Sequence, residues 1–184
     1  NRELTAPAPG EVLLDVFYAA VNPVDAKTRA GLGWAAAQHK DNLPWTPGFD
    51  VCGLVQAVGS SVTDFAVGQR VCGMVFRGGA YASHLLAVAD DLLPVPEVIS
   101  SEQAAALPLA GLTAWQGLFE HGQLQAGETV LISAAAGGVG HIAVQLAKQA
   151  GAKVIASASA SNHAFLLELG ADQVVDYHDS DAMN

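Results

Sequence analysis

The 184-residue chain carries 18 acidic and 8 basic side chains, giving a net charge of −10, and 51% of its residues are hydrophobic. This acidic balance argues against nucleic acid or an anionic membrane as a partner, and the lack of an apolar run of about twenty residues predicts no membrane span. Two isolated cysteines, Cys52 and Cys72, are typical of a reducing, cytoplasmic setting, and the sequence leaves open whether they pair.

Residues 1–97 are predicted to form a β-rich domain. Short apolar segments separated by glycine and proline turns indicate a small barrel-like fold. The expected strands are residues 11–20, 51–58, 70–76 and 81–88, and short helical turns are expected at residues 25–31 and 34–39.

Residues 98–184 are predicted to form a second domain of mixed α/β type. Ser100 and Gln103 have the spacing of a capping box for a helix at residues 102–106, and Pro108 separates it from a second helix at about 110–120. The elements that follow are strands at 129–133, 153–157 and 173–177, with helices at 141–150 and about 162–169 between them. This order is half of a doubly wound parallel Rossmann sheet.

The turn after the first of these strands carries a nucleotide-binding pattern. Gly138, Gly140 and Ala143 fill the spacing G-x-G-x-x-[GA], which brings backbone N–H groups and a helix N-terminus to a pyrophosphate. The alternative is an ordinary strand-to-helix turn. The strands and helices that follow favour the nucleotide site.

Five motifs occur in a specific order along almost the whole chain. They are VNPVD at 21–25, PGFDVCGLVQAVGSSV at 47–62, GGAYASH at 78–84, AALPLAGLTAWQGL at 105–118 and AAAGGVG at 134–140. On these motifs the chain resembles the medium-chain dehydrogenase/reductase superfamily and, within it, the zinc-free quinone oxidoreductases and enone reductases related to zeta-crystallin. The resemblance implies a GroES-like catalytic domain at 1–97, a Rossmann domain at 98–184, and NADPH in the cleft between them.

The chain departs from the zinc-dependent members of that superfamily at their ligand positions. Asn22 stands where those members have a cysteine, and Phe49 and Asp50 stand where they have a histidine and a glutamate. A phenyl ring cannot bind zinc and a carboxamide is a poor ligand for it, so no metal site is expected.

The resemblance assigns roles to three residues near the nicotinamide. The carboxamide of Asn22 is expected to touch the nicotinamide riboside. Lys27 is expected to contact the nicotinamide ribose or the developing oxyanion, and Thr113 is expected to lie close to the nicotinamide carboxamide. The alternatives are an Asn-Pro turn, a solvated surface lysine and a helix-surface threonine. Asn22 and Lys27 are the candidate catalytic residues.

The remaining candidates would bind the other half of the cofactor. The glycine turn would hold the pyrophosphate through Ala136, Gly137, Gly138, Val139 and Gly140. Residues 157–161 contain no carboxylate, so Ser157, Ser159 and the following His163 are expected to accept a 2′-phosphate. Tyr177 matches a family tyrosine beside the adenosine phosphate, and the alternative is an aromatic that covers the sheet edge.

Three functional hypotheses follow. The first is a zinc-independent, NADPH-dependent reductase of quinones or α,β-unsaturated carbonyls, which forms a homodimer in the full-length protein. The second is a 2-enoyl thioester reductase of the same fold, and the third a non-enzymatic, crystallin-like NADPH-binding protein. The first strands of the GroES-like domain and the second half of the Rossmann domain are expected to lie outside these 184 residues. We therefore expect little turnover from the segment alone. We also expect the half-sheet to leave four of its apolar side chains poorly covered on one side: Val130, Ile132, Val154 and Val174.

Overall fold

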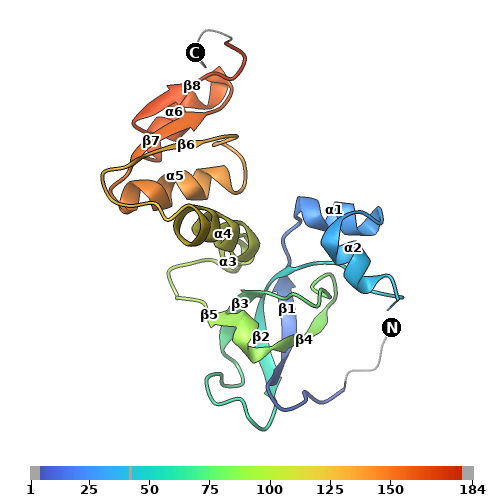
Figure 1. Ribbon diagram of the computed structural model, residues 1–184. Helices are drawn as coiled ribbons and strands as arrows, with labels where there is room; N and C mark the ends of the chain where they lie inside the picture. The colour runs from blue at the N-terminus through green and yellow to red at the C-terminus, as the bar shows by residue number, and fades with distance from the viewer. Residues whose placement is uncertain (1–4, 42, 180–184) are drawn as a thin grey trace. The chain divides into compact units, whose positions relative to one another are not determined.

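The computed structural model describes residues 5–41 and 43–179. The chain divides between Leu109 and Ala110 into two compact units (Figure 1). This division lies twelve residues beyond the boundary expected near residue 97, because the first helix after that point, α3 (Ser101–Ala106), packs on strands of the first unit. In the described residues no helix is long and apolar enough to cross a bilayer.

The first unit is built on an antiparallel sheet. Within the described residues this sheet has five strands in the order β4-β1-β2-β3-β5. The strands are β1 (Glu11–Tyr18), β2 (Asp50–Val58), β3 (Arg70–Met74), β4 (His84–Val88) and β5 (Leu92–Pro94). Two short helices, α1 (Pro23–Arg29) and α2 (Gly33–His39), lie between β1 and β2, and a 3-10 turn, η1 (Ala89–Asp91), precedes β5.

Strand β2 lies at the centre of this unit and is buried on both faces. Val51 and Val55 point into the main apolar core, while Cys52 points to the opposite face and packs against Ala104 and Ala105 of α3. Cys52 faces Cys72 across the β2–β3 ladder, and both thiols are free. The central strand therefore carries its first residue, Asp50, into a fully enclosed environment.

In this unit one strand begins later than predicted, and another was not predicted. The strand expected at 81–88 begins at His84, because Ala80 and Tyr81 donate their backbone N–H groups to Gly48 and Pro47 and form a bend instead. The short strand β5 was missed, since a segment that ends in Pro94 resembles a loop.

The second unit holds a parallel sheet with helices packed on it. Among the described residues the sheet has three strands in the order β6-β7-β8, as expected for half of a doubly wound fold. Its elements are β6 (Thr129–Ile132), α5 (Gly140–Gln149), β7 (Lys153–Ser157), a 3-10 turn η3 (Ala160–Asn162), α6 (His163–Glu168) and β8 (Gln173–Val175). Helix α4 (Pro108–Trp115) runs directly into a π-helical segment, η2 (Gln116–His121).

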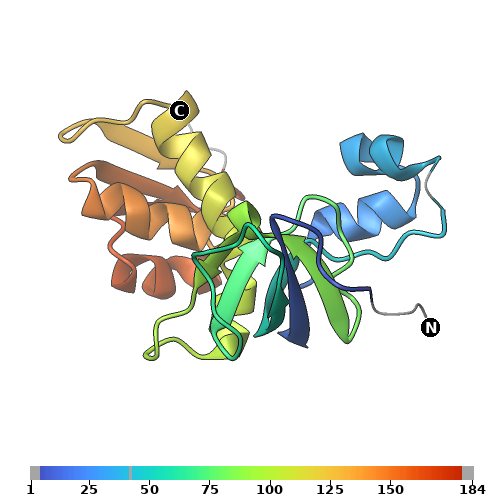
Figure 2. The same ribbon diagram turned by 90° about the horizontal axis from the view of Figure 1, so that it is seen from below.

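The coverage of this sheet differs from the sequence expectation. Helices α5 and α6 both lie on one face of the sheet (Figure 2), as right-handed crossovers in a single direction require. Ile132 and Val154 point into the core beneath these helices and are 7% and 0% exposed, so the expectation that they would be poorly covered was wrong. The alternation of the strand turns Leu131 to the other face, where it is 53% exposed, so β6 is buried on one face only.

Candidate functional site

The glycine turn joins β6 to α5 and is tied to the neighbouring strand. Ala135 donates its backbone N–H to the carbonyl of Ser157 at the end of β7, 3.0 Å away, and Gly137 donates to Ala134 at 2.9 Å. Ala134 adopts a positive φ of 49°, which sharpens the turn. The turn is thus held at the carboxyl ends of the parallel strands, where ligands of such sheets bind.

The two motif glycines, Gly138 and Gly140, differ in the space around their Cα atoms. A Cβ on Gly140 would lie 2.5 Å from the carbonyl oxygen of Ala134 and 2.6 Å from the Cα of Ala135, so no side chain fits there. A Cβ on Gly138 would meet nothing within 4 Å. Gly140 is therefore required for the close packing of helix on strand, whereas Gly138 leaves space open on the outer side of the turn.

Backbone N–H groups face that open space. His141 directs both its backbone N–H and its ring Nδ1 at the carbonyl of Gly137, at 3.1 and 2.9 Å. Within the described residues the N–H groups of Gly138 and Val139 have no protein acceptor. These free donors stand at the positive end of the ten-residue helix α5, so the residues present fit the pyrophosphate of a dinucleotide.

The serine-rich loop after β7 is internally hydrogen-bonded. Ser157 is buried, and its role as a direct ligand residue stays a prediction. Ser159 Oγ lies 3.3 Å from Ser161 Oγ and accepts a hydrogen bond from Asn162 Nδ2 at 3.0 Å. The ring of His163, at the start of α6, lies with Nε2 3.2 Å from the carbonyl of Ala158. Ser159 and His163 are therefore brought to the same loop.

A carboxylate from outside the loop also lies beside it. Asp176, which follows β8, accepts the backbone N–H of Ala160 at 3.2 Å and that of His178 at 2.9 Å. The hydrogen bond from His178 is the main reason that the pKa of Asp176 lies below its usual range, so the carboxylate is ionised. Its neighbour Tyr177 is exposed and packs on His178 with ring centroids 4.3 Å apart.

In the first unit, Asn22 stands at the N-terminus of α1 and is held by two carboxylates. Its backbone N–H donates to Asp25 Oδ2 at 2.7 Å, and its side-chain Nδ2 donates to Asp50 Oδ2 at 2.8 Å. Asp25 also accepts the N–H of Gly48 at 3.2 Å. Asn22 is therefore more than an Asn-Pro turn, because its side chain is fixed by residues distant in the sequence.

Asp50 is a buried carboxylate to which the sequence analysis assigned no role. It is 0% exposed, and its second oxygen, Oδ1, accepts the backbone N–H of Leu109 at 2.8 Å. Burial raises the pKa of Asp50 to about 6, and the hydrogen bonds from Asn22 and Leu109 oppose that rise. The sequence offered two signals for Asp50, its place at the start of an otherwise apolar strand and its match to the glutamate position of the zinc-dependent enzymes.

Tyr81 completes this group of side chains. Its hydroxyl donates to the carbonyl of Ala20 at 3.3 Å, and its ring occupies the place that a side chain on Gly48 would need. Burial, followed by the nearby carboxylate of Asp25, raises the pKa of Tyr81 to about 12. Tyr81 therefore stays protonated at neutral pH.

Phe49 fills the position at which zinc-dependent enzymes have a histidine. It is completely buried, and its ring centroid lies 5.7 Å from that of Trp34 and 5.9 Å from that of Trp45. Among the described residues no group of three or more His, Cys, Asp or Glu side chains could hold a metal ion. Phe49 is thus a core residue.

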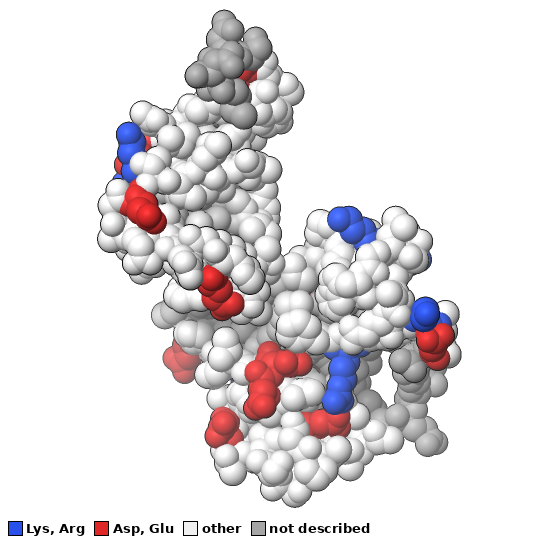
Figure 3. Space-filling view, viewed as in Figure 1, with Lys and Arg blue, Asp and Glu red and all other residues white. Residues whose placement is uncertain are grey.

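The two other candidates near the nicotinamide lie on helix surfaces. Lys27 is exposed on α1, five residues beyond Asn22, and Thr113 is exposed on α4. Both positions agree with solvated side chains as well as with ligand contacts, so their functional roles stay predictions. Acidic and basic side chains are scattered over the face shown in Figure 3, and in places the two kinds lie next to each other.

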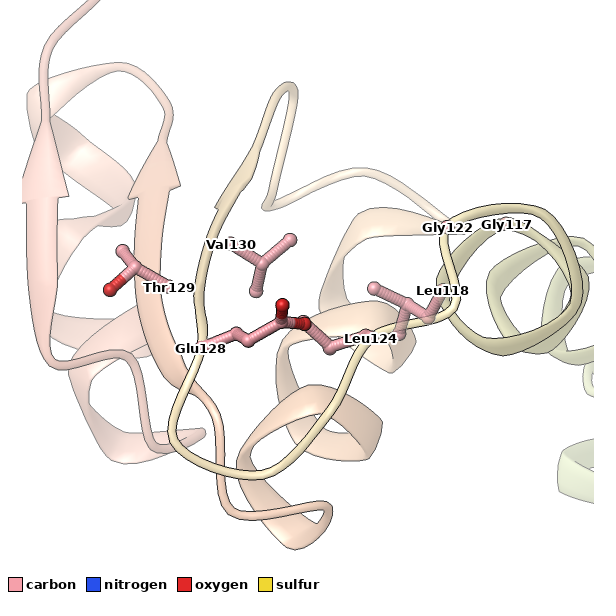
Figure 4. Close-up of a pocket in the computed structure, with 7 residues that line it drawn as sticks. All are labelled: Gly117, Leu118, Gly122, Leu124, Glu128, Thr129 and Val130. Atoms are coloured by element: carbon pink, nitrogen blue, oxygen red, sulfur yellow. The ribbon is translucent and has the colours of Figure 1, made fainter.

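A cavity of about 400 Å³ lies elsewhere in the second unit. It is lined by residues of η2, β6 and the segment between them (Figure 4): Gly117, Leu118, Gly122, Leu124, Glu128, Thr129 and Val130. None of these belongs to the glycine turn, so this cavity is separate from the nucleotide site.

Two family profiles match the chain. One, described as alcohol dehydrogenase GroES-like domain, covers residues 8–97, and the other, described as zinc-binding dehydrogenase, covers residues 138–184. Together they include both Asn22 and the second half of the glycine turn.

Named relatives agree with these profiles. Mouse quinone oxidoreductase is 37% identical over 95% of this chain and 52% of its own length. The structure of the Coxiella burnetii quinone oxidoreductase matches 97% of this chain and 58% of its own, with 43% identity and a TM-score of 0.88. The structure of the Escherichia coli quinone oxidoreductase, solved in complex with NADPH, matches 98% of this chain and 54% of its own, with 36% identity and a TM-score of 0.86. The chain spans about half the length of the curated relatives it matches.

Proposed function

Because the chain belongs to the medium-chain dehydrogenase/reductase superfamily, we propose that it is part of a zinc-independent oxidoreductase that transfers a hydride from NADPH to a quinone or an α,β-unsaturated carbonyl. The glycine turn is the observation that carries this proposal. It offers the N–H groups of Gly138 and Val139, which have no protein acceptor in the described part of the chain, at the N-terminus of α5, beside Gly140, where a Cβ would clash with the backbone of Ala134 and Ala135.

Each part of the second unit has a role in holding the cofactor. The glycine turn, residues 136–140, binds the pyrophosphate through backbone N–H groups and the dipole of α5. Ser159 and His163 bind the adenosine 2′-phosphate, and Tyr177 covers the adenosine side. When bound, the nicotinamide supplies the hydride.

The first unit orients the reacting groups. Asn22 hydrogen-bonds the nicotinamide riboside, and Lys27 steadies a ribose hydroxyl or the developing oxyanion. Hydride addition to a quinone or enone produces a delocalised enolate, which hydrogen bonds can stabilise. Asn22 and Phe49 at two zinc-ligand positions support chemistry of this kind, since neither side chain suits zinc.

The test uses the full-length protein. We expect NADPH oxidation with simple quinones or enones, less than about 0.1 equivalent of zinc by elemental analysis, and activity unchanged by chelators, because a site without thiolate and imidazole binds zinc poorly. One tightly bound zinc per chain would overturn the metal-free assignment.

A substrate panel separates the alternatives. Turnover confined to 2-enoyl thioesters would replace the quinone and enone assignment, and tight NADPH binding without turnover on any acceptor would point to a non-enzymatic role. Homodimerisation of the longer protein and a cytoplasmic location stay predictions.

A further inference from the structure

Asp50 is a fully buried carboxylate whose two oxygens are both engaged. Oδ2 accepts the side-chain N–H of Asn22 and Oδ1 accepts the backbone N–H of Leu109, each at 2.8 Å. Leu109 is the second residue of α4, so the carboxylate also stabilises the N-terminus of that helix. Asp50 therefore links Asn22 at the start of α1 to Leu109 at the start of α4, although these residues are far apart in the sequence.

The chemistry of the pair dictates how the Asn22 amide is oriented. An ionised carboxylate accepts hydrogen bonds and cannot donate them, so it must face the NH₂ group of Asn22. The carbonyl oxygen Oδ1 lies on the opposite side of Cγ and is turned away from Asp50. The N-terminus of α1 favours the same orientation, because backbone N–H groups there attract an oxygen rather than an NH₂ group.

We propose that Asp50 is a positioning residue, which holds the Asn22 carboxamide in one orientation so that Oδ1 accepts a hydrogen bond from a ribose hydroxyl of the bound nucleotide. This inference rests on the proposed function only in its choice of ligand. The orientation itself follows from the hydrogen bonds of the protein.

Protonation of Asp50 would release this constraint. A neutral carboxyl group has both a donor and an acceptor. Its O–H can donate to Oδ1 of Asn22, or its other oxygen can accept a hydrogen bond from the NH₂ group. The ionisable groups around Asp50 are Asp25 on α1, Cys72 on β3 and Tyr81 before β4. The negative charge of Asp25 adds to burial in favouring the neutral form, so the constraint weakens below about pH 6, the pKa of Asp50.

An isosteric change isolates the role of the charge. In Asp50→Asn the new side chain keeps an oxygen for the N–H of Leu109, but it presents its NH₂ group to Asn22. Two NH₂ groups cannot hydrogen-bond each other, so the Asn22 amide must turn over or lose its partner. The matched control is Asp90→Asn, which removes an exposed carboxylate of the same unit.

The binding experiment uses full-length protein and two ligands. NADPH reaches both the adenosine and the nicotinamide regions, whereas adenosine 2′,5′-bisphosphate lacks the riboside that Asn22 would contact. We expect Asp50→Asn to weaken NADPH binding by about tenfold, the effect of one hydrogen bond, and to leave binding of the bisphosphate unchanged. Asp90→Asn should change neither.

A double mutant tests whether Asp50 acts through Asn22. If it does, Asp50→Asn should have no further effect on NADPH binding once Asn22→Ala is present. Equal weakening of both ligands, full additivity of the two changes, or unchanged NADPH binding in Asp50→Asn would each overturn the proposal.

A spectroscopic readout is independent of any ligand. The ¹⁵N resonance of the Asn22 side-chain amide should titrate with the Asp50 carboxyl between about pH 5 and pH 7 and become pH-independent in Asp50→Asn. An amide resonance that is unchanged across this range in the unmodified protein would overturn the inference. If neither nucleotide binds the unmodified protein, the proposed function fails, and this titration still decides the role of Asp50.

Discussion

Asp50 and Asp176 are carboxylates at the candidate sites of the two units, and their surroundings shift their pKa values in opposite directions. Asp50 lies in the closed interior of the antiparallel unit, where burial raises its pKa to about 6. Asp176 lies at the end of the parallel sheet, where the N–H of His178 lowers its pKa. Both accept two hydrogen bonds, so the difference arises from solvent access rather than from the number of partners.

The comparison extends to the groups that each unit offers to a ligand. In the first unit, the side-chain N–H of Asn22 and both oxygens of Asp50 are hydrogen-bonded within the protein, which fixes the orientation of Asn22 before anything binds. In the second unit, the N–H groups of Gly138 and Val139 have no protein acceptor among residues 5–41 and 43–179. One unit is thus suited to orienting a reacting group, and the other to binding an anion.

The largest expected effect is a loss of stability that distinguishes the buried face of β6 from its exposed face. Ile132→Ala removes a side chain from the core beneath α5 and α6, and we expect it to lower the free energy of unfolding of the 184-residue chain by about 2–5 kcal/mol. Leu131→Ala changes the exposed face and should have an effect within about 0.5 kcal/mol. Urea denaturation of both variants makes the measurement. Equal losses would mean that the second face is also covered.

The next prediction concerns the cost of burying Asp50. Its pKa in the folded protein is about 6 against 3.8 for the ordinary group, so the folded state binds the proton more tightly. The corresponding stability is present below about pH 4 and is lost as the pH rises through 6. Relative to the unmodified protein, Asp50→Asn should therefore gain about 2 kcal/mol in free energy of unfolding between pH 4 and pH 7.5.

Chemical denaturation at a series of pH values measures this gain. Asp176→Asn is the control, and because its pKa is lowered its pH dependence should have the opposite sign. A stability difference for Asp50→Asn that is independent of pH would show that the carboxyl is not destabilised by burial.

A third pair of variants compares the two motif glycines. Gly140→Ala forces a Cβ against Ala134 and Ala135, and we expect a loss of about 1–3 kcal/mol in stability together with loss of nucleotide binding. Gly138→Ala meets no protein atom and should retain its stability while binding NADPH at least about tenfold more weakly, because the methyl group enters the pyrophosphate space. Thermal melts and fluorescence titration separate the two effects. Unchanged NADPH binding in Gly138→Ala would place the pyrophosphate elsewhere.

The smallest expected effect is on the choice between NADPH and NADH. The ring of His163 lies at the serine-rich loop, where it can donate a hydrogen bond to the 2′-phosphate, while the carboxylate of Asp176 at the same loop repels that phosphate. We expect Asp176→Asn to raise the preference for NADPH by a few-fold, roughly the effect of one screened charge, and His163→Ala to lower it. Dissociation constants of both variants for NADPH and NADH provide the test. An unchanged preference in both variants would exclude this loop from phosphate recognition.

The sequence by itself determined the order of the elements and the glycine turn. The alternation of β-branched strands with helices predicted the parallel sheet, and the spacing of Gly138, Gly140 and Ala143 predicted the turn, because both depend on neighbouring residues. It also placed the capping box of α3, in which Ser100 and Gln103 are three residues apart.

Only the tertiary structure decided which side chains act together. Asn22 and Asp50 are 28 residues apart, and Asp50 and Leu109 are 59 apart, so their hydrogen bonds depend on how strands and helices pack. The same holds for Asp176, which reaches the serine loop from 16 residues away, and for Leu131, whose exposed face depends on which side α5 and α6 cover. Periodicity along the chain fixes which residues share a face, whereas the surroundings of that face are set by segments that the local pattern does not contain.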